Sequence, residues 1–155
     1  MAEFSSNNQQ IVNPGETVIF TENPVPCRRG LIRHRDDTGN FLLAGFVPRQ
    51  LRCGCPCCRQ DANYLVDFGA NIAIPTGGTV GEISVAITVD GATIPTSTMT
   101  VTPAAVEQFF NVSRAINASI FVGCCESLAV RNTSNQPILV QNANIIITRP
   151  DLAMR

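Results

Sequence analysis

The chain has 155 residues, of which 45% are hydrophobic and 15% are charged, and its formal net charge is −1. This length favours one compact domain, and the apolar content excludes an intrinsically disordered chain. Lysine is absent, and no apolar run reaches transmembrane length, so we expect neither a nucleic-acid partner nor membrane insertion.

Residues 1–26 are predicted to form an N-terminal arm followed by a first strand. The opening sequence MAEFSSNNQQ is polar and has no basic segment before an apolar one, so no signal peptide is expected. A polar terminus is ordered only when something holds it, which suggests packing on a neighbouring subunit. We expect a protein made without a leader that acts extracellularly or on a particle surface (fibre, spore surface or virion).

The most regular segment is Tyr64–Pro95, in which apolar residues fall at every second position. A period of two places these residues on one face of a sheet. Asp90-Gly91 then supplies the two central residues of a type I′ hairpin turn. With this turn, the expected pairs are Val89 with Ala92, Thr88 with Thr93, and Ile87 with Ile94.

Similar short strands, separated by turn residues, are expected along the rest of the chain. About eight to ten strands with turns every 8–12 residues predict an all-β, antiparallel jelly-roll sandwich. We assign the sandwich to residues 27–149, with a Cys-rich loop at 48–61 and a C-terminal tail at 150–155. One helical turn is expected at Pro103–Glu107. The expected strands are 17–21, 31–35, 41–47, 62–74, 82–89, 97–102, 108–112, 118–122, 128–131 and 138–148.

Five segments resemble the core strands of the tumour-necrosis-factor and complement-head type of jelly roll: Gly39–Gly45, Tyr64–Phe68, Asn71–Pro75, Ser84–Pro95 and Asn142–Arg149. The resemblance extends to bacterial members, such as the C-terminal heads of spore-surface collagen-like glycoproteins, and to proteins of similar length from gut Clostridia and their phages. It implies a trimer that buries an apolar face along a threefold axis. The chain departs from this pattern because it has no collagen-like stalk and carries the Cys-rich loop.

Cysteine is the most unusual feature of the composition, and the cluster Cys53-Gly-Cys55-Pro-Cys57-Cys58 stands out. Disulfides within or between subunits are the favoured interpretation, and an odd number of cysteines leaves one thiol for an intermolecular bond. A metal site and inert packed thiols are the alternatives, although the spacing differs from that of a zinc knuckle. We therefore predict no metal and no cofactor. The disulfide candidates are Cys27, Cys53, Cys55, Cys57, Cys58, Cys124 and Cys125, with Cys27 and the 124–125 doublet expected near the 53–58 loop.

The sequence offers few candidate catalytic residues. His34 is the single histidine, and a nucleophile would need it as a base held by a third group. We interpret it instead as a surface or interface residue. Asp36-Asp37 lies in a predicted turn, with calcium binding as a minor alternative, and the glycines of 76–81 are interpreted as a strand connector.

Arginines are concentrated in one part of the chain. Seven arginines and two aspartates lie between residues 27 and 59, whereas the rest of the chain carries four arginines and ten acidic residues. The two parts are therefore expected to attract each other, within a subunit or between neighbours.

The leading hypothesis is a non-enzymatic structural protein that self-assembles into a homo-oligomer: a trimer, a fibre, a spore-surface layer or a virion component. Phe109 and Phe110 point to opposite faces of a strand, so at most one of them fills the subunit's own core. The predicted interface residues are Phe109, Phe110, Ile120 and Phe121. The alternative is a receptor- or glycan-binding head on a cell, spore or phage surface. A metal-dependent enzyme is a weaker third hypothesis, because the chain has one histidine.

Overall fold

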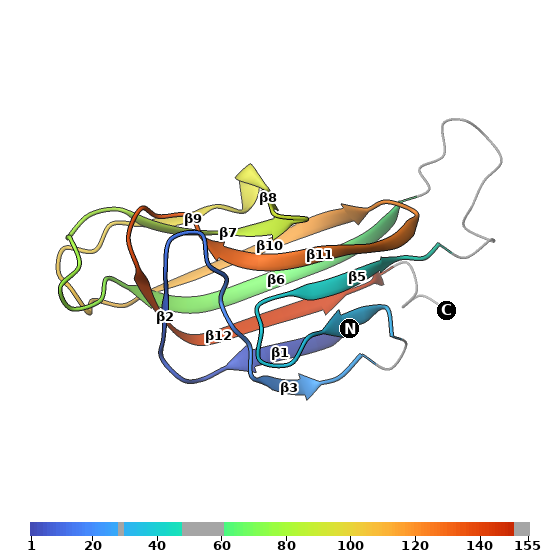
Figure 1. Cartoon of the computed structure of the whole chain (residues 1–155), viewed down its shortest axis with the longest axis horizontal. Helices are drawn as coiled ribbons and strands as arrows, with labels where there is room; N and C mark the ends of the chain where they lie inside the picture. Colours follow the sequence, from blue (N-terminus) through green and yellow to red (C-terminus); the bar gives the residue numbers. More distant parts are fainter. Residues whose placement is uncertain (28–29, 48–60, 151–155) are drawn as a thin grey trace.

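The computed structural model describes residues 1–27, 30–47 and 61–150, and within them the chain forms two antiparallel six-stranded sheets. The strands run along the long axis of the molecule (Figure 1). Sheet A contains, in spatial order, β10 (Phe110–Ile120), β6 (Ala62–Ala73), β12 (Ile138–Thr148), β1 (Ala2–Ser6) and β3 (Glu22–Val25), with β2 (Gln10–Val12) also paired to β12. Sheet B contains β4 (Ile32–His34), β5 (Phe41–Gly45), β11 (Gly123–Asn132), β7 (Ile83–Val89) and β8 (Ala92–Thr93), with β9 (Met99–Val101) also paired to β7. The predicted all-β sandwich is confirmed.

The alternating pattern of the central segment has the expected consequence. On β6, Tyr64, Val66 and Phe68 are fully buried, whereas the residues between them are exposed. The side chains on the inner faces of the two sheets form one continuous core, in which Phe4, Phe20 and Phe41 also lie. Each strand places every second side chain in this shared core, which explains why so many short strands form a stable domain.

The β7–β8 hairpin forms in the predicted register. Thr88 pairs with Thr93 and Val89 pairs with Ala92, and the Ile94 amide donates to the Ile87 carbonyl at 2.9 Å. Asp90 and Gly91 have φ angles of 47° and 78°, as a type I′ turn requires. The Asp90 carboxylate also accepts hydrogen bonds from the amide and the hydroxyl of Ser127 at 2.7 and 3.2 Å.

The predicted N-terminal arm is wrong. Residues 2–6 form β1, which lies between β12 and β3 in sheet A of the same subunit. Ala2 and Phe4 point into the core, so the terminus is held by its own domain. The overall polarity of the segment concealed two apolar residues at alternate positions.

Three other elements differ from the prediction. Residues 17–21 make two isolated bridges, from Thr17 to Arg131 and from Phe20 to Thr38, and no strand. The helical turn at 103–107 is absent; instead the Glu107 amide donates to the Ile74 carbonyl at 2.7 Å, which holds this segment in a turn. The strands expected at 108–112 and 118–122 are one continuous strand, β10.

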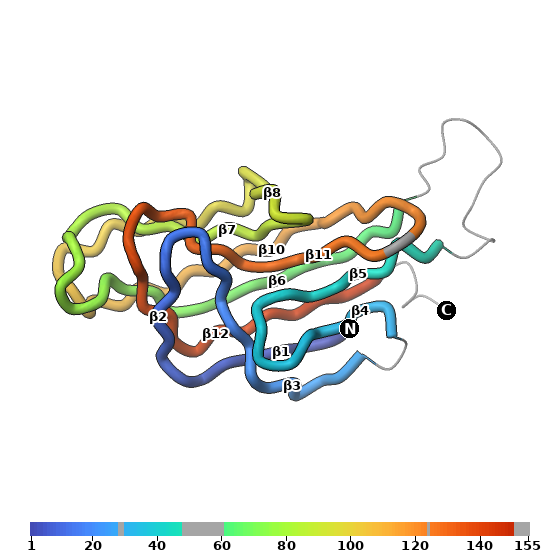
Figure 2. The backbone as a smooth tube through the Cα atoms, viewed as in Figure 1, coloured from blue at the N-terminus to red at the C-terminus, as the bar shows by residue number. Residues whose placement is uncertain are grey.

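The two ends of the sandwich have different connections. The chain enters β7 and β12 through residues 74–82 and 133–137 at one end, and β5 and β10 finish at the other (Figure 2). At this second end Gly45 pairs with Gly123 and Ala62 pairs with Ile120. No helix in the described part of the chain is long and apolar enough to cross a membrane.

Candidate functional site

The edge of sheet A at β10 is the longest exposed strand edge that the structure describes. β10 pairs with β6 over its whole length, from Phe110 with Ile72 to Ile120 with Ala62, and has no strand on its other side. The strand has 11 residues, which corresponds to about 35 Å. Unpaired amide and carbonyl groups on such an edge, and the side chains along it, are open to a partner.

The other outer strands are short or blocked. β3 has four residues and contains Pro24, whose nitrogen has no hydrogen to donate. β4, β8 and β9 have three, two and three residues. Within the described ranges, β10 is therefore the edge best suited to a partner.

Three of the four predicted interface residues lie at the ends of β10. Phe109 and Phe110 are at its start and are 37% and 36% exposed, and Phe121 follows its last residue and is 73% exposed. The prediction allowed one of the first two rings into the core, but both are accessible. Ile120 is wrong as an interface candidate, because its side chain is fully buried in the core of its own subunit.

One cation also projects at this edge. The register places Arg114 opposite Phe68, on the side of β10 that faces sheet B, yet its side chain is exposed. Sheet B ends there in β9 and the short helix η2 (Pro95–Ser97), both of which β10 contacts. The edge thus combines apolar rings at both ends with a positive charge between them.

The outer face of sheet A has a different character. Its two acidic side chains nearest the centre, Asp67 and Glu3, lie on β6 and β1, and no arginine occupies an outward position on β10, β6 or β12. Apart from the buried pair Ala73 and Leu139, the other outward residues on these three strands are all uncharged: Asn111, Ser113, Ala115, Asn117, Ser119, Asn63, Leu65, Gly69, Asn71, Gln141, Asn144, Ile146 and Thr148. The face is low in charge and weakly acidic.

The cysteines are only partly described. Cys27 packs against the core and is half-buried, and Cys125 is exposed. Strand pairing places both at the same end of the sandwich as the end of β5 and the start of β6, between which the Cys-rich loop is inserted. Cys53, Cys55, Cys57, Cys58 and the side chain of Cys124 lie outside the described part, so the disulfide assignment stays a prediction.

His34 is a packing residue. Its ring lies against Phe41 and Phe4, with centroids 4.7 and 5.0 Å apart, and its Nε2 is 2.9 Å from the Thr38 carbonyl oxygen. Across the described ranges, no group of three or more His, Cys, Asp or Glu side chains comes together as a metal site would require.

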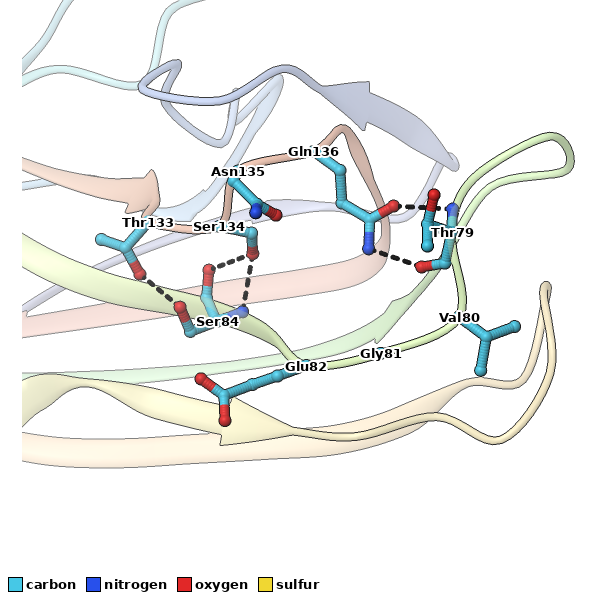
Figure 3. Close-up of a pocket in the computed structure, with 9 residues that line it drawn as sticks. All are labelled: Thr79, Val80, Gly81, Glu82, Ser84, Thr133, Ser134, Asn135 and Gln136. Carbon is cyan, nitrogen blue, oxygen red and sulfur yellow. Dashed lines mark hydrogen bonds between the residues drawn. The ribbon is translucent and has the colours of Figure 1, made fainter.

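A polar hollow of about 650 Å³ lies at the end of the sandwich where the chain enters β7 and β12 (Figure 3). One wall is the connection into β7 and the other is the β11–β12 connection. Gln136 links the walls, accepting from the Thr79 amide at 2.9 Å and donating to the Thr79 carbonyl at 2.8 Å. Sequence reasoning assigned residues 76–81 only a connecting role, because it does not show that 133–136 lie beside them.

The buried Asn132 and its neighbours fix the second wall. The Asn132 amide donates to the carbonyls of Val12 and Gln136, both at 2.9 Å, and its oxygen accepts from the Ser134 amide at 2.8 Å. Ser84 is 2.7 Å from the Thr133 hydroxyl, and its amide donates to the Ser134 hydroxyl at 2.7 Å. The hollow is therefore formed in advance of any ligand.

No protein-family model and no curated protein matches the sequence. Among solved structures, the chain is similar to the globular domain of zebrafish complement 1qA protein, with a TM-score of 0.51 and 9% identity over 94% of both chains. A second similar structure is the EclA C-terminal domain, a sugar-binding protein, with a TM-score of 0.40 and 15% identity over 92% of this chain and 79% of that one. The first similarity, together with the two sheets described above, shows that this chain has a C1q-like jelly-roll fold.

Proposed function

We propose that this chain is a non-enzymatic structural protein that assembles with copies of itself by docking the edge of β10 on the outer face of sheet A of a neighbour. The observation that carries the proposal is the exposure of Phe109, Phe110 and Phe121 at both ends of an 11-residue strand whose outer edge is unpaired. Large apolar side chains grouped along one edge are a mark of a protein–protein contact.

Charge supports this pairing of surfaces. Arg114 projects from the edge, whereas Asp67 and Glu3 lie on the face, and small residues such as Gly69 and Ala115 allow a strand edge to approach part of the face closely. Edge and face belong to different patches, so the contact is heterologous. Repetition of such a contact gives a closed ring, such as a trimer, or an open fibre, spore-surface layer or virion component.

The cysteines would reinforce the assembly. Cys125 is exposed, and Cys27 lies at the same end of the sandwich, beside the insertion point of the Cys-rich loop. Cross-links there would keep subunits together in an oxidising setting, which fits the extracellular or particle-surface location that we propose.

The test is the mass of the purified chain at micromolar concentration by mass photometry and sedimentation, with and without reductant. We expect an oligomer whose dissociation constant rises at least tenfold in Phe110→Asp. Leu42→Asp, which places the same charge on an exposed residue of the outer face of sheet B, is the matched control and should leave the mass unchanged. A stable monomer would refute the proposal, and identical migration on gels with and without reductant would refute the cross-links alone.

A second candidate function is that of a receptor- or glycan-binding head. The polar hollow favours it, because a preformed concave site is what a small ligand needs.

A further inference from the structure

We propose that the hollow between the 79–84 and 133–136 segments binds a neutral or amino-bearing sugar residue. This inference deepens the second candidate function and is independent of self-assembly. At about 650 Å³, the hollow lies within the size range of small-ligand sites.

Several polar groups at the hollow are already used by the protein. Ser84, Thr133 and Ser134 bond to one another, and Gln136 bonds to the backbone of Thr79 (Figure 3). These bonds hold the two walls together and remove those groups from competition for a ligand. Rigid walls reduce the entropy lost when a ligand binds.

Other polar groups at the hollow remain available. The Glu82 carboxylate and the Asn135 amide are exposed and make no hydrogen bond to another described residue, and they come from opposite walls. The Thr79 hydroxyl is likewise available, because only the backbone of that residue is bonded to Gln136. These groups supply both acceptors and donors along the hollow, and sugar hydroxyls can pair with either kind of group.

The surroundings narrow the class of ligand. Among the residues that the structure describes, Glu82 is the only charged one that lines the hollow, so an acidic ligand such as a phosphate or a sialic acid would be repelled and would find no cation there. Val80 is 51% exposed and is an apolar residue among those that line the hollow. A neutral hexose satisfies these conditions, and an amino sugar adds a favourable charge next to Glu82.

The test begins with an array of neutral, amino-bearing and sialylated oligosaccharides, probed with the assembled wild-type protein. The best neutral or amino-bearing ligand is then titrated into isotope-labelled protein. We expect amide shifts confined to 79–84 and 133–136, and about tenfold weaker binding for both Glu82→Gln and Asn135→Ala, as for loss of one hydrogen bond to a charged or buried group. Both side chains are exposed and unbonded within the described chain, so these variants should fold normally.

Asp36→Asn is the matched control, because it also removes one exposed carboxylate but does not line the hollow. It should bind like the wild type. Binding of sialylated glycans only, shifts at other residues, or no binding at millimolar sugar would overturn the proposal. Mass photometry of the same variants separates this outcome from a failure of assembly, since neither substitution touches β10 or sheet A.

Discussion

At the scale of single residues, Ser97 shows how a small polar side chain replaces backbone pairing. It is fully buried, and its hydroxyl accepts from the Ile87 amide at 2.9 Å and donates to the Ile94 carbonyl at 2.7 Å. The chain leaves β8 and returns to β7 at β9, and Ser97 satisfies the strand groups that this detour exposes. Such a side chain contributes more to the stability of the fold than its size suggests.

Ser97→Ala should therefore lower the free energy of unfolding by about 1–3 kcal/mol, because the buried Ile87 amide loses its hydrogen-bond partner. Thr96→Ala, the neighbouring exposed residue, should change it by no more than about 0.5 kcal/mol. Urea unfolding of the two variants provides the measurement. Equal stabilities would mean that water or backbone movement satisfies this amide in the variant.

Single residues also show where sequence reasoning succeeds and fails. The Asp90-Gly91 turn was predictable because its conformation depends on those two residues alone. Ile120 was misassigned because the register of β10 decides its direction, and that register depends on β6, which lies far away in the sequence. The free groups of the hollow were not predictable for the same reason, since its walls are about 50 residues apart.

At the scale of elements, β1 is the largest departure from the prediction. A polar five-residue strand carries too weak a pattern to be recognised alone, and only its pairing with β12 and β3 shows its role. Residues 17–21 are the opposite case. Their local pattern is typical of a strand, but they pair with other segments only at two isolated bridges. Strand propensity indicates which segments fit a sheet, and the available partners decide which of them form strands.

Because β1 belongs to its own subunit, Phe4→Ala should destabilise the fold by about 3–5 kcal/mol, since the ring is buried among Phe41, His34 and the core. Ile11→Ala, in the neighbouring β2, removes a side chain that is 62% exposed and should cost less than about 1 kcal/mol. Thermal unfolding at several protein concentrations makes the measurement decisive. If the stability lost in Phe4→Ala depended on protein concentration, β1 would instead pack on a neighbouring subunit, as an arm does.

At the scale of the whole molecule, the candidate sites lie on separate parts of the sandwich. Cys27, Cys125 and the end of β10 lie at one end, the polar hollow lies at the other, and the low-charge face of sheet A extends between them. The sandwich class was predictable because period-two strands and turn residues recur along the chain. The order of strands within each sheet was not predictable, because it depends on pairings between segments that are distant in the sequence. Which strand edge is open follows from that order.

The proposed edge-to-face contact and an edge-to-edge contact lead to different results when variants are mixed. Phe110→Asp with Arg114→Glu should block the edge, and Gly69→Arg should block the face, where an added side chain meets only ordinary contacts with Val112 and Ser113. Each variant alone should be monomeric, because every subunit needs both surfaces to extend the assembly. An equimolar mixture should form a dimer with one intact edge-to-face contact, detected by mass photometry of differently tagged chains. If edges paired with edges, the Gly69→Arg protein would assemble alone and the mixture would form no new species, so the composition of the mixture decides between the two arrangements.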